Sequence, residues 1–316
     1  MKKQLAVIAI GGNSLIKHRE KRTVEDQYNA ICETTKHLVD LVELDYQLVI
    51  THGNGPQVGF IMLRSEIARN QIGLHIVPLS SCVADTQGAI GLQIQQALAD
   101  ELEKRKLTGK AVTIVTQVEI SPTDPGFNVP DKPIGEFYLK EQLPTLKKQH
   151  PDWILKQDAN RGYRRVVASP VPLKIVEEEA VVALLKNDYH VVTAGGGGVP
   201  VVRSDIGLTS VDAVIDKDKT ASLLATNLSA PLLVISTAVE QVMLNFGTVD
   251  EKPLGQVTAA EMEQYLHDGH FAPGSMAPKI EAAIDFIKNG GQKVIITNPE
   301  NIGEAIRHGK GTQIVP

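Results

Sequence analysis

Residues Val191–Pro200 read VVTAGGGGVP, and the rest of the chain is organised around them. The β-branched residues predict a buried strand, and the four glycines after it leave backbone N–H groups unshielded by side chains. Two further predicted strands end in similar turns: Leu5–Ile10 runs into GGN, and Gln47–Thr51 runs into HGNG. Unshielded N–H groups bind anionic oxygen, and such turns gather at the carboxyl edge of a parallel sheet. Together the turns favour a polyphosphate site, although any one of them alone could be only a tight turn.

Composition limits the class of protein. The chain has 316 residues, 42% of them hydrophobic, and a net charge of −5, which is typical of one large α/β domain or two lobes. No run of Lys and Arg carries interleaved aromatic residues, which argues against nucleic-acid binding. The apolar runs are strand-sized, which argues against a membrane span. Cys32 and Cys82 form neither a disulfide framework nor a metal pattern, so we expect buried thiols in a cytoplasmic protein.

The order of the predicted elements indicates the fold class. Strand-like runs alternate with helix-like runs, among them a helix over residues 84–104, a strand over 111–118 and a helix over 174–187. Thr23 and Thr258 each stand three residues before an acid, the pattern of a capping box at a helix start. We therefore predict an α/β fold with an open, mostly parallel sheet between helices.

Residues 119–170 break this alternation. Six prolines lie from Pro122 to Pro151, and proline disfavours regular core elements. A structureless loop of this length is improbable inside a compact domain. The stretch also holds the only tryptophan, Trp153, which a linker does not need. We predict a protruding lid subdomain inserted after a strand, with a flexible linker as the alternative.

Charged residues near the turns suggest the chemistry, because phosphoryl transfer needs positioned positive charge. Lys132 lies in PDKPIG, Lys217 in DKD, and Lys279 directly follows GSMAP. Lys279 stands out because a cation in the first turn of a helix opposes the helix dipole unless an anion binds there. Asp216 and Asp218 either form a charged helix cap, orient lysines or hold a metal ion. The chain lacks GxxxxGK[ST], HRD, DFG, GxSxG and zinc-ligand spacings, which excludes P-loop hydrolases and protein kinases.

A family resemblance rests on the motifs GGN, HGNGPQVG, PDKPIGEFY, AGGGGVPVV, SVDAVIDKD and GSMAPK, in that order. They resemble the motifs of carbamate kinases, within the amino acid kinase family, over about residues 5–312. The resemblance implies the amino acid kinase fold, with a sheet of about eight strands, and a homodimer. It also implies an N-terminal lobe, residues 1–205, that binds the phosphate acceptor and carries the lid at 119–170. Residues 206–316 would form a nucleotide-binding lobe.

The implied reaction is Mg²⁺-dependent phosphoryl transfer between ATP and carbamate, giving ADP and carbamoyl phosphate and often run in the ATP-forming direction. An anionic carbamate needs no general base. The resemblance implies a catalytic set of Lys132, Lys217, Asp218 and Lys279. It implies that the transferring phosphoryl group is held by Gly11, Gly12, Asn13, Gly53, Asn54 and Gly55. It assigns the nucleotide to Gly195, Gly196, Gly197, Asp216, Thr237 and Met276, and it implies no protein metal ligand.

Two departures from related patterns bear on the substrate. Ala9 stands where other amino acid kinases carry the lysine of a K-x-G-G motif, so Lys132 is the natural substitute and glutamate-type acceptors are disfavoured. Residues Ser80–Thr86 also depart from the carbamate kinase pattern, which suggests a divergent branch. A kinase for another small carboxylate or a nucleoside monophosphate, or a catalytically silent nucleotide-binding regulator, stays open. A dinucleotide-binding dehydrogenase lacks its GxGxxG turn here.

Overall fold

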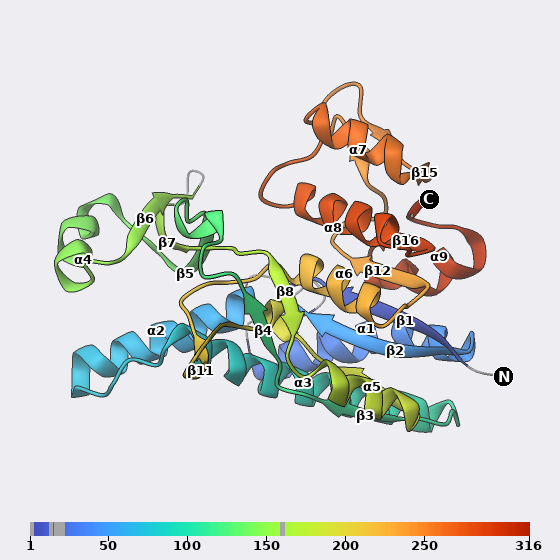
Figure 1. The fold of residues 1–316 in the computed structure, drawn as a ribbon, viewed down its shortest axis with the longest axis horizontal. Helices are drawn as coiled ribbons and strands as arrows, with labels where there is room; N and C mark the ends of the chain where they lie inside the picture. The colour runs from blue at the N-terminus through green and yellow to red at the C-terminus, as the bar shows by residue number, and fades with distance from the viewer. Residues whose placement is uncertain (1–2, 13–14, 16–22, 159–161) are drawn as a thin grey trace.

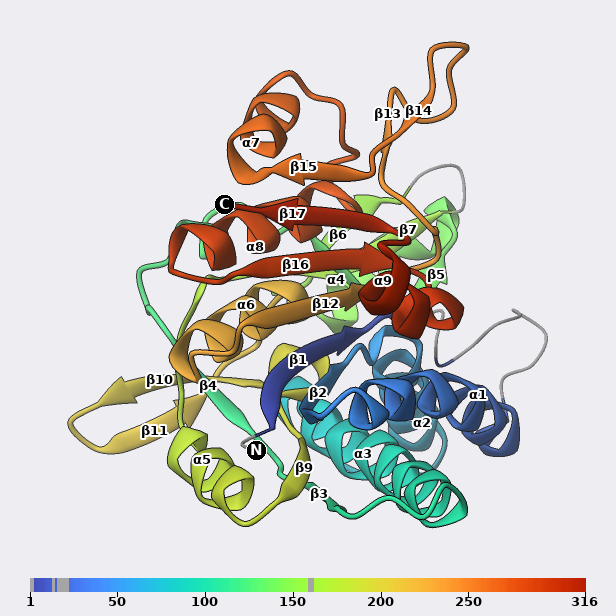
Figure 2. The same ribbon diagram turned by 90° about the vertical axis from the view of Figure 1, so that its right-hand side faces the viewer.

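The computed structural model describes residues 3–12, 15, 23–158 and 162–316 of the chain (Figure 1). One large sheet is built from strands of both halves of the sequence (Figure 2). In spatial order its eight strands are β15 (Gln256–Thr258), β17 (Thr312–Val315), β16 (Lys293–Thr297), β12 (Leu232–Ser236), β1 (Gln4–Ile10), β2 (Tyr46–His52), β9 (Tyr189–Val192) and β3 (Lys110–Thr113). Only the pair β16–β17 is antiparallel, so the predicted open, mostly parallel sheet is confirmed.

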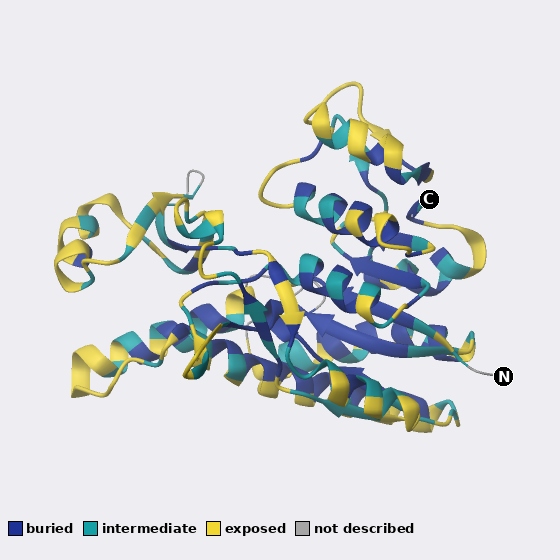
Figure 3. Cartoon of the chain, in the orientation of Figure 1, coloured by how far each residue is buried: buried dark blue, intermediate teal, exposed yellow. Residues whose placement is uncertain are grey.

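Helices cover both faces of this sheet because its central strands are apolar on both sides. In β1, Ala6, Ile8 and Ile10 pack into one core and Val7 and Ala9 into the other. The first core receives α1 (Val24–Glu43), α3 (Leu79–Lys104) and α9 (Ile302–His308). The second receives α5 (Glu178–Lys186), α6 (Lys217–Asn227), α7 (Ala259–His267) and α8 (Ala277–Lys288). The burial colours of Figure 3 follow this layering, with the sheet dark blue between the helices.

The capping boxes place two helix starts as predicted. The Thr23 hydroxyl accepts from the Asp26 N–H at the start of α1, and the Thr258 hydroxyl accepts from the Glu261 N–H at the start of α7. Among the described residues, no helix combines the length and the apolar composition needed to cross a membrane.

Three predicted element bounds were wrong. The strand expected over 111–118 is two strands, β3 in the large sheet and β4 (Gln117–Ile120) in a second sheet of order β11-β10-β4-β8. The break falls at Thr116, whose backbone exchanges two hydrogen bonds with the Gln87 side chain and whose carbonyl also accepts from the Val199 N–H at the start of β10. The helix expected from residue 174 is preceded by β8 (Pro172–Ile175), which pairs with β4, and α3 begins at Leu79 rather than at residue 84. The remaining strands of the second sheet are β10 (Val199–Ser204) and β11 (Gly207–Ser210).

A small subdomain protrudes beyond the large sheet, next to the end of α2 (Gly55–Ile72) (Figure 1). Its antiparallel sheet has the order β5-β7-β6, from β5 (Lys132–Tyr138), β6 (Ile154–Gln157) and β7 (Tyr163–Val167), and it carries α4 (Leu143–Gln149). Trp153 stacks on His150 with ring centroids 3.9 Å apart, and the Arg165 guanidinium lies 5.0 Å from the Trp153 centroid. This subdomain lies within the insert predicted at 119–170.

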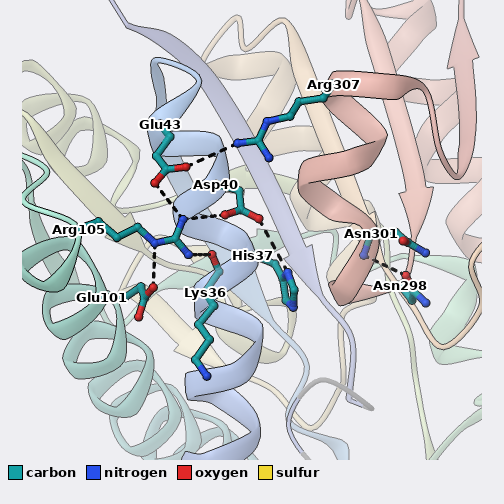
Figure 4. Close-up of polar contacts among 9 residues, drawn as sticks. All are labelled: Lys36, His37, Asp40, Glu43, Glu101, Arg105, Asn298, Asn301 and Arg307. Atoms are coloured by element: carbon teal, nitrogen blue, oxygen red, sulfur yellow. Dashed lines mark hydrogen bonds and ion pairs between the residues drawn. The ribbon is translucent and has the colours of Figure 1, made fainter.

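An ion-pair cluster ties α1, α3 and α9 together on one side of the molecule (Figure 4). The Arg105 guanidinium contacts the carboxylates of Asp40 at 2.7 Å, Glu101 at 2.8 Å and Glu43 at 3.2 Å. Glu43 also contacts Arg307 of α9 at 3.6 Å. The cluster therefore joins an N-terminal helix pair to a C-terminal helix at a point away from the glycine turns.

Candidate active site

A cavity of about 290 Å³ lies where the glycine turns, the lid strand β5 and the starts of α6 and α8 meet. We call it the lysine cavity, because Lys132, Lys217 and Lys279 all line it. Gly53, Asn54 and Gly55 line it from the turn after β2. Its lining also has an apolar part that includes Val58, Val83, Pro133, Ile134, Val214 and Ile215. The lysines that were singled out from three distant parts of the sequence are thus neighbours in space.

Two of these lysines share one carboxylate. Asp218, which is 2% exposed, binds Lys217 through Oδ1 and Lys279 through Oδ2, the latter at 2.6 Å. Burial lowers the pKa of Lys217, and the neighbouring charge of Lys279 lowers it further, whereas Asp218 opposes this change. The buried carboxylate therefore fixes two ammonium groups at the same place, with their remaining N–H donors available to phosphate oxygens.

The third lysine comes from the lid. The Lys132 Nζ atom donates to Asp216 Oδ2 at 2.9 Å, and Asp216 Oδ1 also caps α6 by accepting from the Asp218 N–H. Burial alone would raise the pKa of Asp216, but the charges of Lys132 and Lys217 outweigh burial and hold this pKa below its ordinary value. Asp216 is thus both a helix cap and the anchor of the lid lysine.

The first two glycine turns lie together as predicted. A Cβ atom built on Gly53 would stand 3.5 Å from the Gly12 nitrogen and 3.6 Å from Lys217 Cδ. The Gly53 N–H donates to the Ile10 carbonyl, which ties this turn to the end of β1. A Cβ atom on Gly11 would lie only 2.7 Å from the Ser236 carbonyl oxygen. Asn13 lies outside the described residues.

The four-glycine turn after β9 has a mixed role. Gly196 lines the lysine cavity, and its φ of +67° is a left-handed conformation that favours glycine. A Cβ atom on Gly195 would meet His52 Nε2 at 2.3 Å, and one on Gly197 would meet the Ile215 carbonyl oxygen at 2.3 Å. Gly195 and Gly197 therefore allow close packing, and the described residues that line the lysine cavity include neither of them.

A second cavity of about 330 Å³ adjoins the first and shares Ser275 and Lys279 with it. We call it the apolar cavity, because Met243, Phe246, Phe271 and Met276 contribute to its walls. Thr237 and Met276, both predicted to bind nucleotide, line it. A flat apolar ring in this cavity would place attached phosphates beside Lys279.

Sequence reasoning missed several lining residues. Ser275 lies inside a quoted motif and joins the two cavities, but no pattern distinguished it from its neighbours. Val58 and Val83 form apolar wall that only tertiary packing brings together. His52 precedes the Gly53 turn; burial lowers its pKa to about 4, so its imidazole is neutral at neutral pH.

Residues 4–298 match the amino acid kinase family along most of the chain. The chain belongs to the amino acid kinase family. It is 50% identical to the carbamate kinase-like protein YahI of Escherichia coli, with 99% of each chain covered. It is also 42% identical to the carbamate kinase of Oenococcus oeni, over 98% of this chain and 97% of that protein.

The fold matches that of solved family members. The carbamate kinase of Giardia lamblia bound to AMP-PNP superposes with a TM-score of 0.92 at 37% identity, covering 99% of this chain and 98% of that one. The resemblance to carbamate kinases drawn from the motifs is therefore confirmed, as is the amino acid kinase fold.

Proposed function

We propose that this protein is a carbamate kinase that transfers a phosphoryl group between Mg-nucleotide and carbamate. In the ATP-forming direction, a β-phosphate oxygen of ADP attacks the phosphorus of carbamoyl phosphate, the bond from phosphorus to the carbamate oxygen breaks, and carbamate leaves with the electron pair. No proton is transferred in this step, so the site needs no general base. The whole-chain similarity to proteins named carbamate kinase supports the acceptor.

One observation carries the proposal: two lysines held on the single buried carboxylate of Asp218, where the lysine and apolar cavities join. Charge that spreads over the phosphoryl oxygens in the transition state is stabilised most by donors that are already in place. Lys217 and Lys279 would contact the transferring phosphoryl group and the nucleotide phosphates. Lys132 would approach from the lid, and the turns at Gly12 and Gly53 would offer backbone N–H groups.

The Mg²⁺ ion enters as part of the nucleotide substrate. Within the part of the chain that the structure describes, no three His, Cys, Asp or Glu side chains gather into a metal cluster. The carboxylates at the lysine cavity, Asp216 and Asp218, both pair with lysines. Mg²⁺ commonly keeps several waters and binds to substrate phosphates with few protein ligands, so this arrangement fits an ion carried by the nucleotide.

Each of the two lobes would bind a different substrate. Of the residues that the structure describes, those that line the apolar cavity all lie in the proposed nucleotide lobe, 206–316, and this supports placing the adenine there. The N-terminal lobe, 1–205, would supply the acceptor side through its glycine turns and the lid. The protein would act as a cytoplasmic homodimer, and exposed apolar side chains near the end of α2 are available for such a contact: Ile67, Ile72, Leu74 and Ile76.

The proposal is tested by replacing Lys279. In the assay of ATP formation from MgADP and carbamoyl phosphate, Lys279→Ala should lower kcat at least about a hundredfold, because about 3 kcal/mol of charge stabilisation is lost. Lys288→Ala is the matched control, since Lys288 lies at the other end of α8 and pairs with Glu263 on the surface. A Lys279→Ala enzyme that turns over at the wild-type rate would refute the role given to this lysine.

A further inference from the structure

Two adjacent residues of α3 connect the helix to two glycine turns. Thr86 and Gln87 are each 1% exposed. The Gln87 amide exchanges two hydrogen bonds with the Thr116 backbone, and the Thr116 hydroxyl accepts from the Ala194 N–H, directly before the four glycines. Thr86 reaches the other turn, because its hydroxyl oxygen accepts from Asn54 Nδ2 at 2.8 Å. The start of α3 therefore braces both turns.

The hydrogen bonds of Thr86 determine which way the Asn54 amide points. The Thr86 hydroxyl donates its single hydrogen to the Val83 carbonyl at 2.6 Å. Its oxygen is then left only with acceptor capacity, so the group that Asn54 offers to it must be the NH₂. The Asn54 carbonyl oxygen, Oδ1, is consequently directed away from α3.

The residues around the Asn54 side chain limit which groups can contact its Oδ1 atom. Asn54 is 7% exposed and lines the lysine cavity. Its carboxamide lies against the bare backbone of Gly196, where a Cβ atom would stand 2.2 Å from Nδ2 and 2.7 Å from Oδ1. Among the residues that the structure describes, Oδ1 has no hydrogen-bond partner. Asn54 thus brings an amide oriented by Thr86 to a cavity whose apolar wall includes Val58 and Val83.

We propose that Thr86 is a positioning residue that fixes Asn54 Oδ1 to accept a hydrogen bond from the amino group of the carbamoyl donor. This inference rests on the proposed function. Carbamoyl phosphate and acetyl phosphate have nearly the same shape, but the first carries N–H donors where the second has a methyl group. An apolar wall discriminates weakly between two substrates of the same shape. A hydrogen-bond acceptor in the site discriminates strongly, because the substrate without a donor leaves that acceptor unpaired. The Thr86–Asn54 pair therefore selects the carbamoyl donor.

The test compares three variants of the full chain with wild type, using MgADP and either carbamoyl phosphate or acetyl phosphate. Thr86→Val removes the hydroxyl at nearly constant shape, and Thr86→Ser keeps it. Thr113→Val is the matched control, because the Thr113 hydroxyl is buried in β3 and has no hydrogen-bond partner within the described part of the chain. If Thr86→Val does not fold, as judged by its melting curve, Thr86→Ala replaces it.

We expect Thr86→Val to lower the ratio of carbamoyl phosphate to acetyl phosphate turnover about tenfold, as the loss of one neutral hydrogen bond predicts. The KM for MgADP and the acetyl phosphate rate should stay at wild-type values, and Thr86→Ser and Thr113→Val should keep the wild-type ratio. An unchanged ratio in Thr86→Val, or an equal loss with both donors, overturns the inference alone. A wild-type protein that makes no ATP from carbamoyl phosphate overturns the proposed function, and this inference with it.

Discussion

Replacing Asp218 by Asn tests how Lys217 and Lys279 are held. The substitution keeps the shape of the side chain but removes the charge that faces both ammonium groups, one of them at 2.6 Å. Unit charges about 4 Å apart interact by about 4 kcal/mol at an effective dielectric constant of about 20. Bound phosphates replace part of this attraction. We expect about 3 kcal/mol to be lost in the transition state, which is about a hundredfold in kcat.

The pH profile gives a second readout. Burial already lowers the pKa of Lys217, and Asp218 opposes that change. Without the carboxylate this pKa falls further, so Lys217 loses its proton at lower pH. The alkaline limb of the Asp218→Asn rate profile should therefore move toward acid, because only the protonated lysine stabilises the phosphoryl charge.

The assay is ATP formation from MgADP and carbamoyl phosphate between pH 6 and 10. Glu281→Gln is the matched control: it makes the same change of carboxylate to amide in the surface pair of Lys219 and Glu281, which also joins α6 to α8. The control should keep the wild-type rate and profile. If Asp218→Asn retained wild-type turnover and an unshifted alkaline limb, the reasoning about the shared carboxylate would be refuted.

Three further predictions concern the lid and stability. Lys132→Gln should lower kcat about a hundredfold in steady-state assays. The control is Lys156→Gln, at a lid lysine that donates to the Pro130 carbonyl, and it should leave kcat unchanged. Equal kcat values in the two variants would show that Lys132 has no role in catalysis. Burial lowers the pKa of His190 from 6.5 to about 4, so the unfolded state binds more protons and stability falls as pH drops from 6.5 to 4, by about 3 kcal/mol in all. His190→Asn keeps an acceptor for the Leu48 N–H, so urea unfolding across this pH range should show a flatter dependence; an identical slope would contradict it. Arg105→Met should lower the free energy of unfolding in urea by about 2 kcal/mol because three carboxylates lose the contact with this guanidinium, with kcat unchanged; a variant as stable as wild type would show that Arg105 does not contribute to stability.

The fold was predictable where local pattern and tertiary context agree. The apolar run of β1 and the two capping threonines were predictable because each pattern lies within a few adjacent residues. The break between β3 and β4 was not predictable, because Gln87, which satisfies the Thr116 backbone, lies 29 residues away in sequence. The end of β8, Lys174 and Ile175, was mistaken for helix because its pairing with β4 is also a distant contact.

The candidate site was likewise predictable only where the pattern is local. Lys217, Asp218 and Lys279 were found because charge beside glycine turns or in a helix's first turn is an unusual local pattern. The apolar wall and the Thr86–Asn54 hydrogen bond could not be inferred, since apolar residues and a buried threonine look alike in the core and at a cavity. The division of residues 1–205 and 206–316 between acceptor and nucleotide stays a prediction.

The central claim is tested most directly by measuring ATP formation from ADP, Mg²⁺ and carbamoyl phosphate, with acetyl phosphate and a donor-free mixture run in parallel. The proposed function predicts rapid ATP formation from carbamoyl phosphate, much slower formation from acetyl phosphate and none without a donor. Tight ADP binding without ATP formation from carbamoyl phosphate would contradict it and would indicate another acceptor or a silent nucleotide-binding regulator.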